Sequence, residues 1–237
     1  GGARGFSLAS PEYPAVDLRF ESLGAVYAVA ALTVLALSRL VYAGGGLVYA
    51  LSARRIEQDV GLEHVFIVND FEAVAYAAAQ VDASGVLQLT GPATAPRGPT
   101  LVVGPGTGLG AAVWIPTPHG PVVLATEAGQ PTLAVSTELE MAIVRQMQRE
   151  HAHVSVEHAL SGPGLMNLYR ALCALNGQSP TLASPDAITA AAMANTDALA
   201  RESLQVFCGL LGSTIGDMAL QYGASGGVYL AGGILPQ

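Results

Sequence analysis

The stretch TLVVGPGTGLGAAVWI, at residues 100–115, decides the fold. It begins with an apolar run at 100–104, crosses a loop with glycine at every second position from 104 to 110, and continues as the apolar run AAVWI at 111–115. Short apolar runs that are rich in β-branched residues and bounded by turn residues are typical of buried strands. The stretch therefore predicts two strands joined by a glycine loop. The same pattern predicts strands at 41–46, 64–68, 119–126 and 226–233.

The segments between these strands predict helices. Residues 50–62 (ALSARRIEQDVGL) predict one helix, with Ser52 as its N-cap and Gly61 near its end. Thr137 and Glu140 have the spacing of a capping box, which opens a predicted helix at 141–151. Further helices are predicted at 15–40, at 71–80, from residue 164 onward and at 199–222, and a loop is predicted at 82–99. Because strands and helices are interleaved along the chain, the sequence predicts an α/β architecture.

The composition is that of an α/β protein with a large core. Charged residues make up 12% of the 237 residues, well below the usual quarter, and hydrophobic residues make up 51%. The formal net charge is -8 and no basic run stands out, so the sequence offers no electrostatic basis for binding nucleic acid. All ten basic residues are arginines, which excludes any mechanism that needs a lysine.

Cysteine content and apolar runs indicate the compartment. The two cysteines, Cys173 and Cys208, lie in apolar helical surroundings without a CxxC motif or a Cys/His cluster. We therefore expect two buried free thiols, no structural zinc site and a reducing cytoplasm. The first residues lack the apolar core of a signal peptide, and the apolar run at 24–37 falls short of the roughly 20 residues that a membrane helix needs. The sequence thus predicts a cytoplasmic protein without a membrane partner.

Asn69 and Asp70 form the first candidate for chemistry, between the predicted strand at 64–68 and the predicted helix at 71–80. Ligands of open α/β sheets gather at the carboxyl ends of strands. A carboxylate at that place can take a proton from a substrate hydroxyl, so Asp70 is a candidate general base. The alternative is structural, because Asn69 and Glu72 have the spacing of a capping box and such residues are ordinary at a helix start.

The glycine loop at 104–110 is a candidate phosphate-binding element, since glycines let backbone N–H groups approach phosphate oxygens closely. It is not a dinucleotide fingerprint, because a strand and not a helix follows it, and it is not a Walker loop, because no lysine follows. Thr107 can hydrogen-bond a terminal phosphate, and Gly232 and Gly233 after the last strand leave room for a nucleoside. The alternatives are a plain tight hairpin for the loop and a plain turn for the glycine pair.

Three polar residues complete the candidate site. Glu127 and Gln130 follow a predicted strand, and Glu157 precedes the segment SGPG at 161–164. A carboxylate can accept hydrogen bonds from two sugar hydroxyls at once, which suits a polyhydroxylated ligand. Taken separately, either glutamate is better explained as a solvated surface residue.

The amino-acid sequences of these motifs and their order along the chain together resemble those of the non-ROK bacterial glucokinases. These belong to the superfamily of hexokinases, actin and sugar kinases. The resemblance covers roughly residues 50–237. It is carried by IVNDFEAVAYA, GPGTGLGAAVW, EAGQ, HVSVEHALSGPGLMNLYRAL and GGVYLAGGI. The ROK sugar kinases are less similar, because their cysteine-rich zinc motif is absent.

The resemblance implies a fold and an activity. The implied fold is the two-domain actin-like ATPase fold, of ribonuclease H-like type, with a small α/β domain at 1–80 and a large one at 81–237 closing over a cleft. The implied activity is ATP-dependent phosphorylation of the glucose 6-hydroxyl to give glucose 6-phosphate, with Mg²⁺. Glucose and ATP are the implied partners, and a homodimer is also implied because members of the family are often dimeric.

The resemblance also implies roles for individual residues. Asp70 matches the general base, and a further set matches residues that contact the sugar: Asn69, Asp70, Glu127, Gln130 and Glu157. Gln130 stands where the family usually has histidine. A last set matches the ATP-binding motifs: Gly1 and Gly2 of the first phosphate motif, Gly106, Thr107 and Gly108 of the second, and Gly232 and Gly233 of the adenosine motif.

The sequence departs from the family at three places. The first phosphate motif of the family reads Asp-x-Gly-Gly-Thr, whereas this chain opens with Gly1-Gly2-Ala3-Arg4, so the aspartate that helps to organise Mg²⁺ falls before residue 1. Residues 20–50 do not match the family, and the family continues through another helix after the position of Gln237. We therefore expect a glucokinase sequence that is incomplete or imperfectly recorded.

Two other functions remain open at this point. The damaged first phosphate motif favours a non-catalytic sugar-binding or regulatory protein on a kinase fold. An actin-like or chaperone-type ATPase of the same superfamily is a further alternative. The set of Asn69, Asp70, Glu127 and Glu157 argues against that ATPase.

Overall fold

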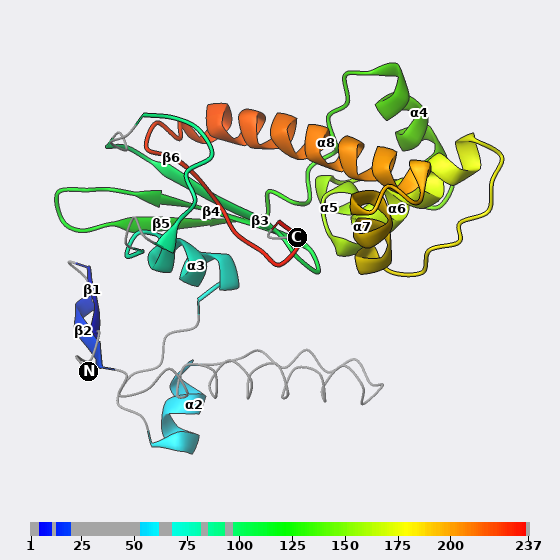
Figure 1. The fold of residues 1–237 in the computed structure, drawn as a ribbon. Coiled ribbons are helices and arrows are strands. Elements are labelled where there is room, and N and C mark those ends of the chain that lie inside the picture. The colour runs from blue at the N-terminus through cyan, green and yellow to red at the C-terminus, as the bar shows by residue number, and fades with distance from the viewer. Residues whose placement is uncertain are drawn as a thin grey trace. The chain divides into compact units, whose positions relative to one another are not determined.

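The computed structural model describes residues 5–10, 13–19, 53–61, 68–81, 85–92 and 97–235. The chain divides into two compact units, which are described separately below (Figure 1). The first comprises Gly1–Ile67 with Pro118–Gly120, and the second comprises Val68–Thr117 with Pro121–Gln237.

The first unit contains a hairpin and a helix. Strand β1 (Gly5–Ser10) pairs antiparallel with β2 (Tyr13–Arg19), with a register shift between Leu8 and Ser10. Helix α2 (Ala53–Val60) is followed by Gly61, whose φ of 73° lies in the left-handed region that glycine adopts without strain. This confirms the predicted helix and its end.

The helix predicted at 15–40 is wrong where the structure describes it, because residues 15–19 belong to β2. Apolar and charged residues alternate from Val16 to Arg19, a period that suits a strand. The rest of that prediction, the strand at 41–46, the cap at Ser52 and most of the strand at 64–68 lie outside the described residues. Val68, which is described, is exposed and not part of a strand.

The second unit is built on a four-stranded sheet of order β5-β4-β3-β6. Strand β3 (Thr100–Pro105) lies between β4 (Leu109–Ile115), which is antiparallel to it, and β6 (Gly227–Leu230), which is parallel to it. Strand β5 (Val122–Thr126) adds antiparallel to β4 and is shorter than its predicted span of 119–126. Leu109 already pairs with Pro105, so β4 begins two residues earlier than predicted and the loop is reduced to 106–108.

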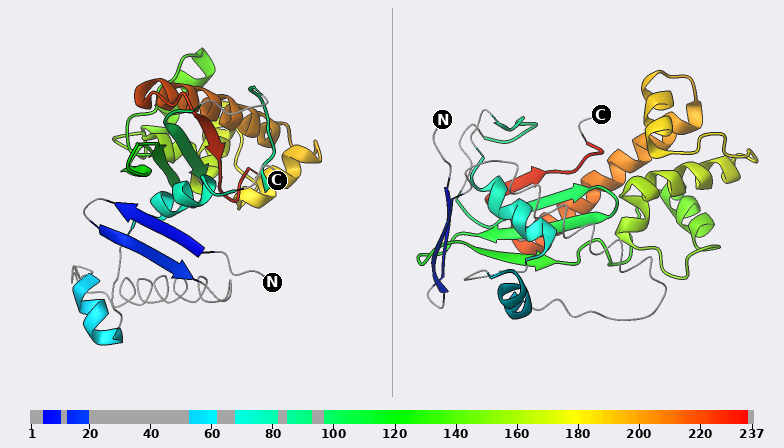
Figure 2. Two further views of the ribbon diagram at one scale, coloured as in Figure 1. Left: turned by 90° about the vertical axis from the view of Figure 1, so that its left-hand side faces the viewer. Right: turned by 90° about the horizontal axis from the view of Figure 1, so that it is seen from below.

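Both faces of this sheet are covered, as Figure 2 shows. Leu101 and Val103 of β3 face the main hydrophobic core, and Val102 between them faces Ala75 of helix α3 (Asp70–Ala78). A strand buried on both faces is a continuous apolar run, which is why TLVVG was recognisable as a strand. Helix α3 packs with the second unit, although the predicted small domain extended to residue 80; the predicted domain assignment stays a prediction.

The other face carries a helical layer whose starts are set by side-chain caps. Its helices are α4 (Glu138–Met147), α5 (Val156–Ala159), α6 (Gly162–Leu175), α7 (Pro185–Met193) and α8 (Ala198–Tyr222). Thr137 and Glu140 form the predicted capping box of α4, which ends at Met147 and not at 151. Ser161 caps α6 by accepting from Gly164 N at 2.9 Å, so this helix begins two residues before its predicted start.

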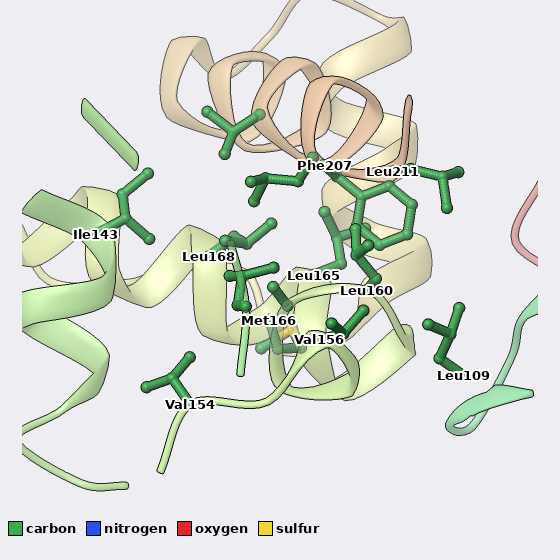
Figure 3. Packing of buried hydrophobic residues seen from close by; sticks show 14 of the residues in the cluster. Leu109, Ile143, Val154, Val156, Leu160, Leu165, Met166, Leu168, Phe207 and Leu211 are labelled. Atoms are coloured by element: carbon green, nitrogen blue, oxygen red, sulfur yellow. The ribbon is translucent and has the colours of Figure 1, made fainter. Parts of the chain in front are cut away.

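Helix α8 provides much of the core. Phe207 and Leu211 pack against Leu160 and Leu165 of the segment from α5 to α6 (Figure 3). Among the described residues, α8 alone is long and apolar enough to cross a membrane by length and composition, a test that a core helix also passes.

The two cysteines differ, contrary to the expectation of two buried thiols. Cys173 is buried on α6, and burial raises the pKa of its thiol. Cys208 on α8 is exposed, so its predicted burial is wrong. The buried face of α8 passes through Phe207 and Leu211, and an apolar sequence stretch does not reveal which face of a helix points away from the core.

Candidate functional site

The loop between β3 and β4 is tied to the start of α6. Gly106 N donates to Gly108 O at 2.7 Å, and Gly106 O accepts from Gly162 N at 2.8 Å. Thr107 is exposed at the tip. In this part of the chain, the backbone N–H groups of Thr107 and Gly108 have no hydrogen-bond partner within the described structure. They are therefore available to an acceptor such as a phosphate oxygen.

Glu157 is the side chain that joins this loop to the predicted sugar-binding residues. Its carboxylate Oε2 accepts from Leu109 N at 2.8 Å, and its Oε1 accepts from Gln130 Nε2 at 3.4 Å. Its backbone N–H donates to Gly129 O at 2.8 Å. A Cβ at Gly108 would collide with the carboxylate of Glu157, so the loop and this carboxylate lie in close contact. The half-buried carboxylate is thus fixed at both oxygens.

Gln130 and Glu127 lie in one turn directly after β5. Gln130 N donates to Glu127 O at 2.9 Å, and both side chains are exposed. Gly129 between them approaches β4 closely, since a Cβ there would lie 2.6 Å from Leu109 O. Sequence reasoning missed Gly129, and its signal was a glycine between two candidate polar residues. The turn brings Gln130 to Glu157. The Glu127 carboxylate has no hydrogen bond within the described part of the chain.

At the start of α3, Asn69 does what the structural alternative predicted. Its Oδ1 accepts from Phe71 N at 2.9 Å and from Glu72 N at 3.4 Å, and Glu72 Oε2 accepts from Asn69 N at 3.4 Å. This is a capping box. Asp70 is the first residue of the helix and is exposed, and its Oδ1 accepts from Phe71 N at 2.8 Å. Most of the hydrogen-bonding capacity of the Asp70 carboxylate is left for a ligand.

Phe71 places this helix start beside the glycine loop. A Cβ at Gly110 would overlap the Phe71 ring, and a Cβ at Gly104 would lie 2.9 Å from its Cζ. The aromatic ring therefore lies against both glycines that flank the loop, and Asp70 precedes it directly in the chain. Sequence reasoning missed Phe71. The available signal was an aromatic residue next to a candidate base, in a chain whose predicted strands at 100–115 are joined by glycines.

The glycine pair after β6 lies at the same end of the sheet. Ala231 N donates to Val103 O at 2.9 Å, which continues the pairing of β6 with β3. Gly232 has a φ of 100° and contacts the carbonyl group of Pro105 so closely that a Cβ would clash. Gly233 is exposed and has open space around it. Gly1 and Gly2 lie outside the described residues.

The fold and the site together define a class of protein. A mixed α/β unit carries, at one end of its sheet, a glycine loop, a fixed glutamate and an exposed aspartate. The fold is similar to that of a solved sugar kinase: a glucokinase from an Antarctic psychrotroph superimposes with a TM-score of 0.71 at 36% sequence identity, over 78% of this chain and 58% of that one.

Sequence comparison gives the family. The model of the Glucokinase family matches residues 47–237, so the chain belongs to that family, the bacterial glucokinases of non-ROK type. A glucokinase-like protein of Xylella fastidiosa (strain 9a5c) is 58% identical over 189 residues, covering 80% of this chain and 57% of its own length. The glucokinase of Saccharophagus degradans is 39% identical over 196 residues, covering 80% of this chain and 59% of its own length. The chain therefore spans a little more than half the length of these relatives.

Proposed function

We propose that this protein is an ATP-dependent glucokinase that phosphorylates the 6-hydroxyl of glucose, with Asp70 as the general base. The observation that carries the proposal is the position of Glu157. Its carboxylate contacts both the backbone of the glycine loop and the side chain of Gln130. One residue thus links a set suited to sugar hydroxyls with a loop suited to phosphates. Membership of the glucokinase family supports the same reaction.

Each side of the site has a distinct task in this proposal. Glu157, Glu127 and Gln130 hold the sugar hydroxyls. Asn69, whose Oδ1 caps α3, offers its Nδ2 to the sugar, and Asp70 takes the proton of the 6-hydroxyl. The sugar oxygen then forms a bond to the γ-phosphorus as the bond to the ADP oxygen breaks. The free N–H groups of Thr107 and Gly108 hold phosphate oxygens, and Gly232 and Gly233 leave space for the adenosine. Positioning supplies most of the catalysis in phosphoryl transfer.

Magnesium enters this proposal with ATP, as part of the nucleotide substrate. Mg²⁺ commonly keeps several waters and is bound through substrate phosphates and one or two carboxylates. Within the described ranges, no group of three or more His, Cys, Asp or Glu side chains could hold a metal ion. In this proposal the triphosphate of ATP supplies most of the ligands of the ion.

The expected dimer and the expected cytoplasmic location stay predictions.

The test is glucose-dependent formation of ADP and glucose 6-phosphate by the wild type and by Asp70→Asn. Removal of the base lowers kcat by about 100-fold or more, because a positioned general base contributes roughly 10²–10⁴-fold. Asp70 is exposed, so the substitution leaves the fold unchanged, as thermal melting checks. A variant that turns over glucose at nearly the wild-type rate overturns the assignment of Asp70.

A second candidate function is a non-catalytic sugar-binding protein on the same fold. It is favoured by Ala3 and Arg4, which stand where the family's first phosphate motif ends in threonine and a polar residue. Calorimetry that detects glucose binding by a protein without turnover selects this function. ATP hydrolysis that is indifferent to any sugar selects the actin-like ATPase alternative instead.

A further inference from the structure

His158 follows Glu157 directly and has no part in the proposed reaction. Its Nδ1 accepts from Ser155 N at 3.1 Å and lies 3.0 Å from Ser155 Oγ. In return, His158 N donates to Ser155 Oγ at 3.3 Å. The two residues form a reciprocal capping box in which histidine occupies the place usually taken by glutamate or glutamine.

This box orders the turn that carries Glu157. Helix α5 has only four residues and cannot be stable on its own, so its conformation depends on its ends and on packing. Val156 is buried in the core on one side of Glu157 (Figure 3). On the other side, His158 O accepts from Asn167 Nδ2 of α6 at 3.0 Å. The capping box holds the first turn, from which Glu157 reaches Leu109 N, together with backbone hydrogen bonds from Val156 N to Pro131 O at 3.0 Å and from Glu157 N to Gly129 O at 2.8 Å.

The hydrogen bond from Ser155 N favours the neutral form of this histidine, whereas the contact of Nδ1 with Ser155 Oγ fits either direction of donation. A backbone amide only donates, so Nδ1 must present a lone pair to Ser155 N, and the ring that makes this bond is neutral. The His151 ring stacks on it with centroids 4.4 Å apart. Burial, and then the proximity of His151, lower the pKa of His158 below its ordinary value of 6.5, with Glu157 opposing and His153 adding to the shift. From α6, the packed neighbour is the uncharged Asn167; Glu150 and Arg170 line a nearby surface hollow together with His151.

We propose that His158 is a positioning residue for Glu157, and that it holds the turn only while its ring is neutral. The inference rests on the proposed role of Glu157 as a sugar ligand. When Nδ1 gains a proton, it faces the Ser155 N–H as a second donor, and this half of the capping box is lost. Glu157 then loses its fixed position against Leu109 N, and affinity for glucose falls with the pH.

Two substitutions separate positioning from a general loss of structure. His158→Gln retains a capping-box partner that does not titrate, and His158→Ala removes the partner. At neutral pH we expect His158→Ala to raise the KM for glucose about tenfold with little change in kcat, the effect of one lost hydrogen bond, and His158→Gln to restore it. As the pH falls through the lowered pKa of His158, the wild type loses affinity for glucose, while His158→Gln keeps it until carboxylates titrate. An unchanged KM in His158→Ala, or an acid profile of His158→Gln that equals the wild type's, overturns the proposal.

A measurement on the unmodified protein separates this inference from the proposed function. NMR follows the His158 ring and the amide signals of Leu109 and Glu157 as the pH is lowered. We expect both amides to shift with the midpoint of the His158 ring. If they do so in a protein that binds no glucose, the proposed function fails and the positioning stands. Amides that stay constant through the His158 titration overturn the positioning, whatever the protein binds.

Discussion

The two carboxylates at the centre of the site, Glu157 and Asp70, are held in opposite ways. Glu157 is half-buried, and both of its carboxylate oxygens accept hydrogen bonds from other segments of the chain. Asp70 is exposed, and its one described hydrogen bond is to the amide of the next residue. A group that binds a substrate gains from being fixed in advance, whereas a base must keep an oxygen free for the incoming proton. The difference therefore matches the two proposed roles.

The largest effect on glucose binding is expected from breaking the fixed carboxylate. Glu157→Gln removes the charge that accepts from Leu109 N and leaves one oxygen in place of two. Hydrogen bonds to charged groups contribute about 1.5–3 kcal/mol, so kcat/KM for glucose falls roughly 10- to 100-fold, mainly through KM. Steady-state kinetics checks this. Glu138→Gln, an exposed carboxylate on α4, is the matched control and stays within about twofold of the wild type. Equal losses in the two variants would contradict the role of Glu157.

The next effect concerns the contact that places Asp70 beside the loop. A methyl group at Gly110 overlaps the Phe71 ring, so Gly110→Ala is expected to lower the free energy of unfolding by about 1–3 kcal/mol. Denaturant unfolding measures it. Gly212→Ala on α8, where a Cβ meets open space, is the control and is expected to stabilise the helix by up to about 1 kcal/mol. If Phe71→Leu does not reduce the loss of stability caused by Gly110→Ala, the contact with the Phe71 ring does not cause that loss.

A smaller effect is expected at the cap of α4, which is far from Asp70 in the sequence. This cap carries no proposed chemistry. Thr137→Ala removes the acceptor for Glu140 N at 3.2 Å and costs about 1 kcal/mol of stability, with no change in KM. Thermal unfolding and kinetics together check this. A change in KM as large as that of Glu157→Gln would remove the distinction between structural caps and the site.

The same cap gives a prediction on pH. Burial by itself would raise the pKa of Glu140, but hydrogen bonds from Ser136 and Thr137 outweigh it and hold the pKa below its ordinary value of 4.5. The ionised form is therefore favoured in the folded state. Its contribution to stability is present above pH 4.5 and is lost as the pH falls through the lowered pKa. The free energy of unfolding, measured from neutral to acid pH, is expected to decline less steeply in Glu140→Gln than in the wild type. Identical slopes would contradict this role of Glu140.

The smallest effect is chemical labelling without loss of stability. Cys208 is exposed and Cys173 is buried, so a thiol reagent is expected to modify Cys208 in the folded protein and Cys173 only after unfolding. Mass spectrometry of peptides identifies the site. Rapid labelling of Cys173 would contradict the packing of α6 in the core.

Local patterns predicted the elements that are apolar along their length, and failed where contacts across the chain decide. The runs that became β3, β6 and α8 are apolar, although only β3 is buried at every position. The early start of β4 at Leu109 depends on pairing with Pro105, and the exposure of Cys208 depends on which face of α8 meets the core. The strand at Tyr13–Arg19 was misassigned because the apolar residues that follow it dominated the pattern.

For the site, the sequence could name the polar residues but not their relations. Asn69 is a helix cap in the structure, and local sequence could not separate that role from a sugar contact because both need a polar side chain at a helix start. Glu157 meets Leu109 across 48 positions of the chain, a distance over which no local pattern carries information. Phe71 and Gly129 were missed for the same reason, since each matters through a close approach to a distant strand.

Calorimetric titration of glucose into Asp70→Asn and Glu157→Gln, side by side with the wild type, tests the central claim most directly. If Glu157 binds the sugar and Asp70 acts as the base, Asp70→Asn keeps a Kd within about threefold of the wild type and Glu157→Gln weakens it about tenfold or more. Loss of binding in Asp70→Asn together with unchanged binding in Glu157→Gln would contradict the account.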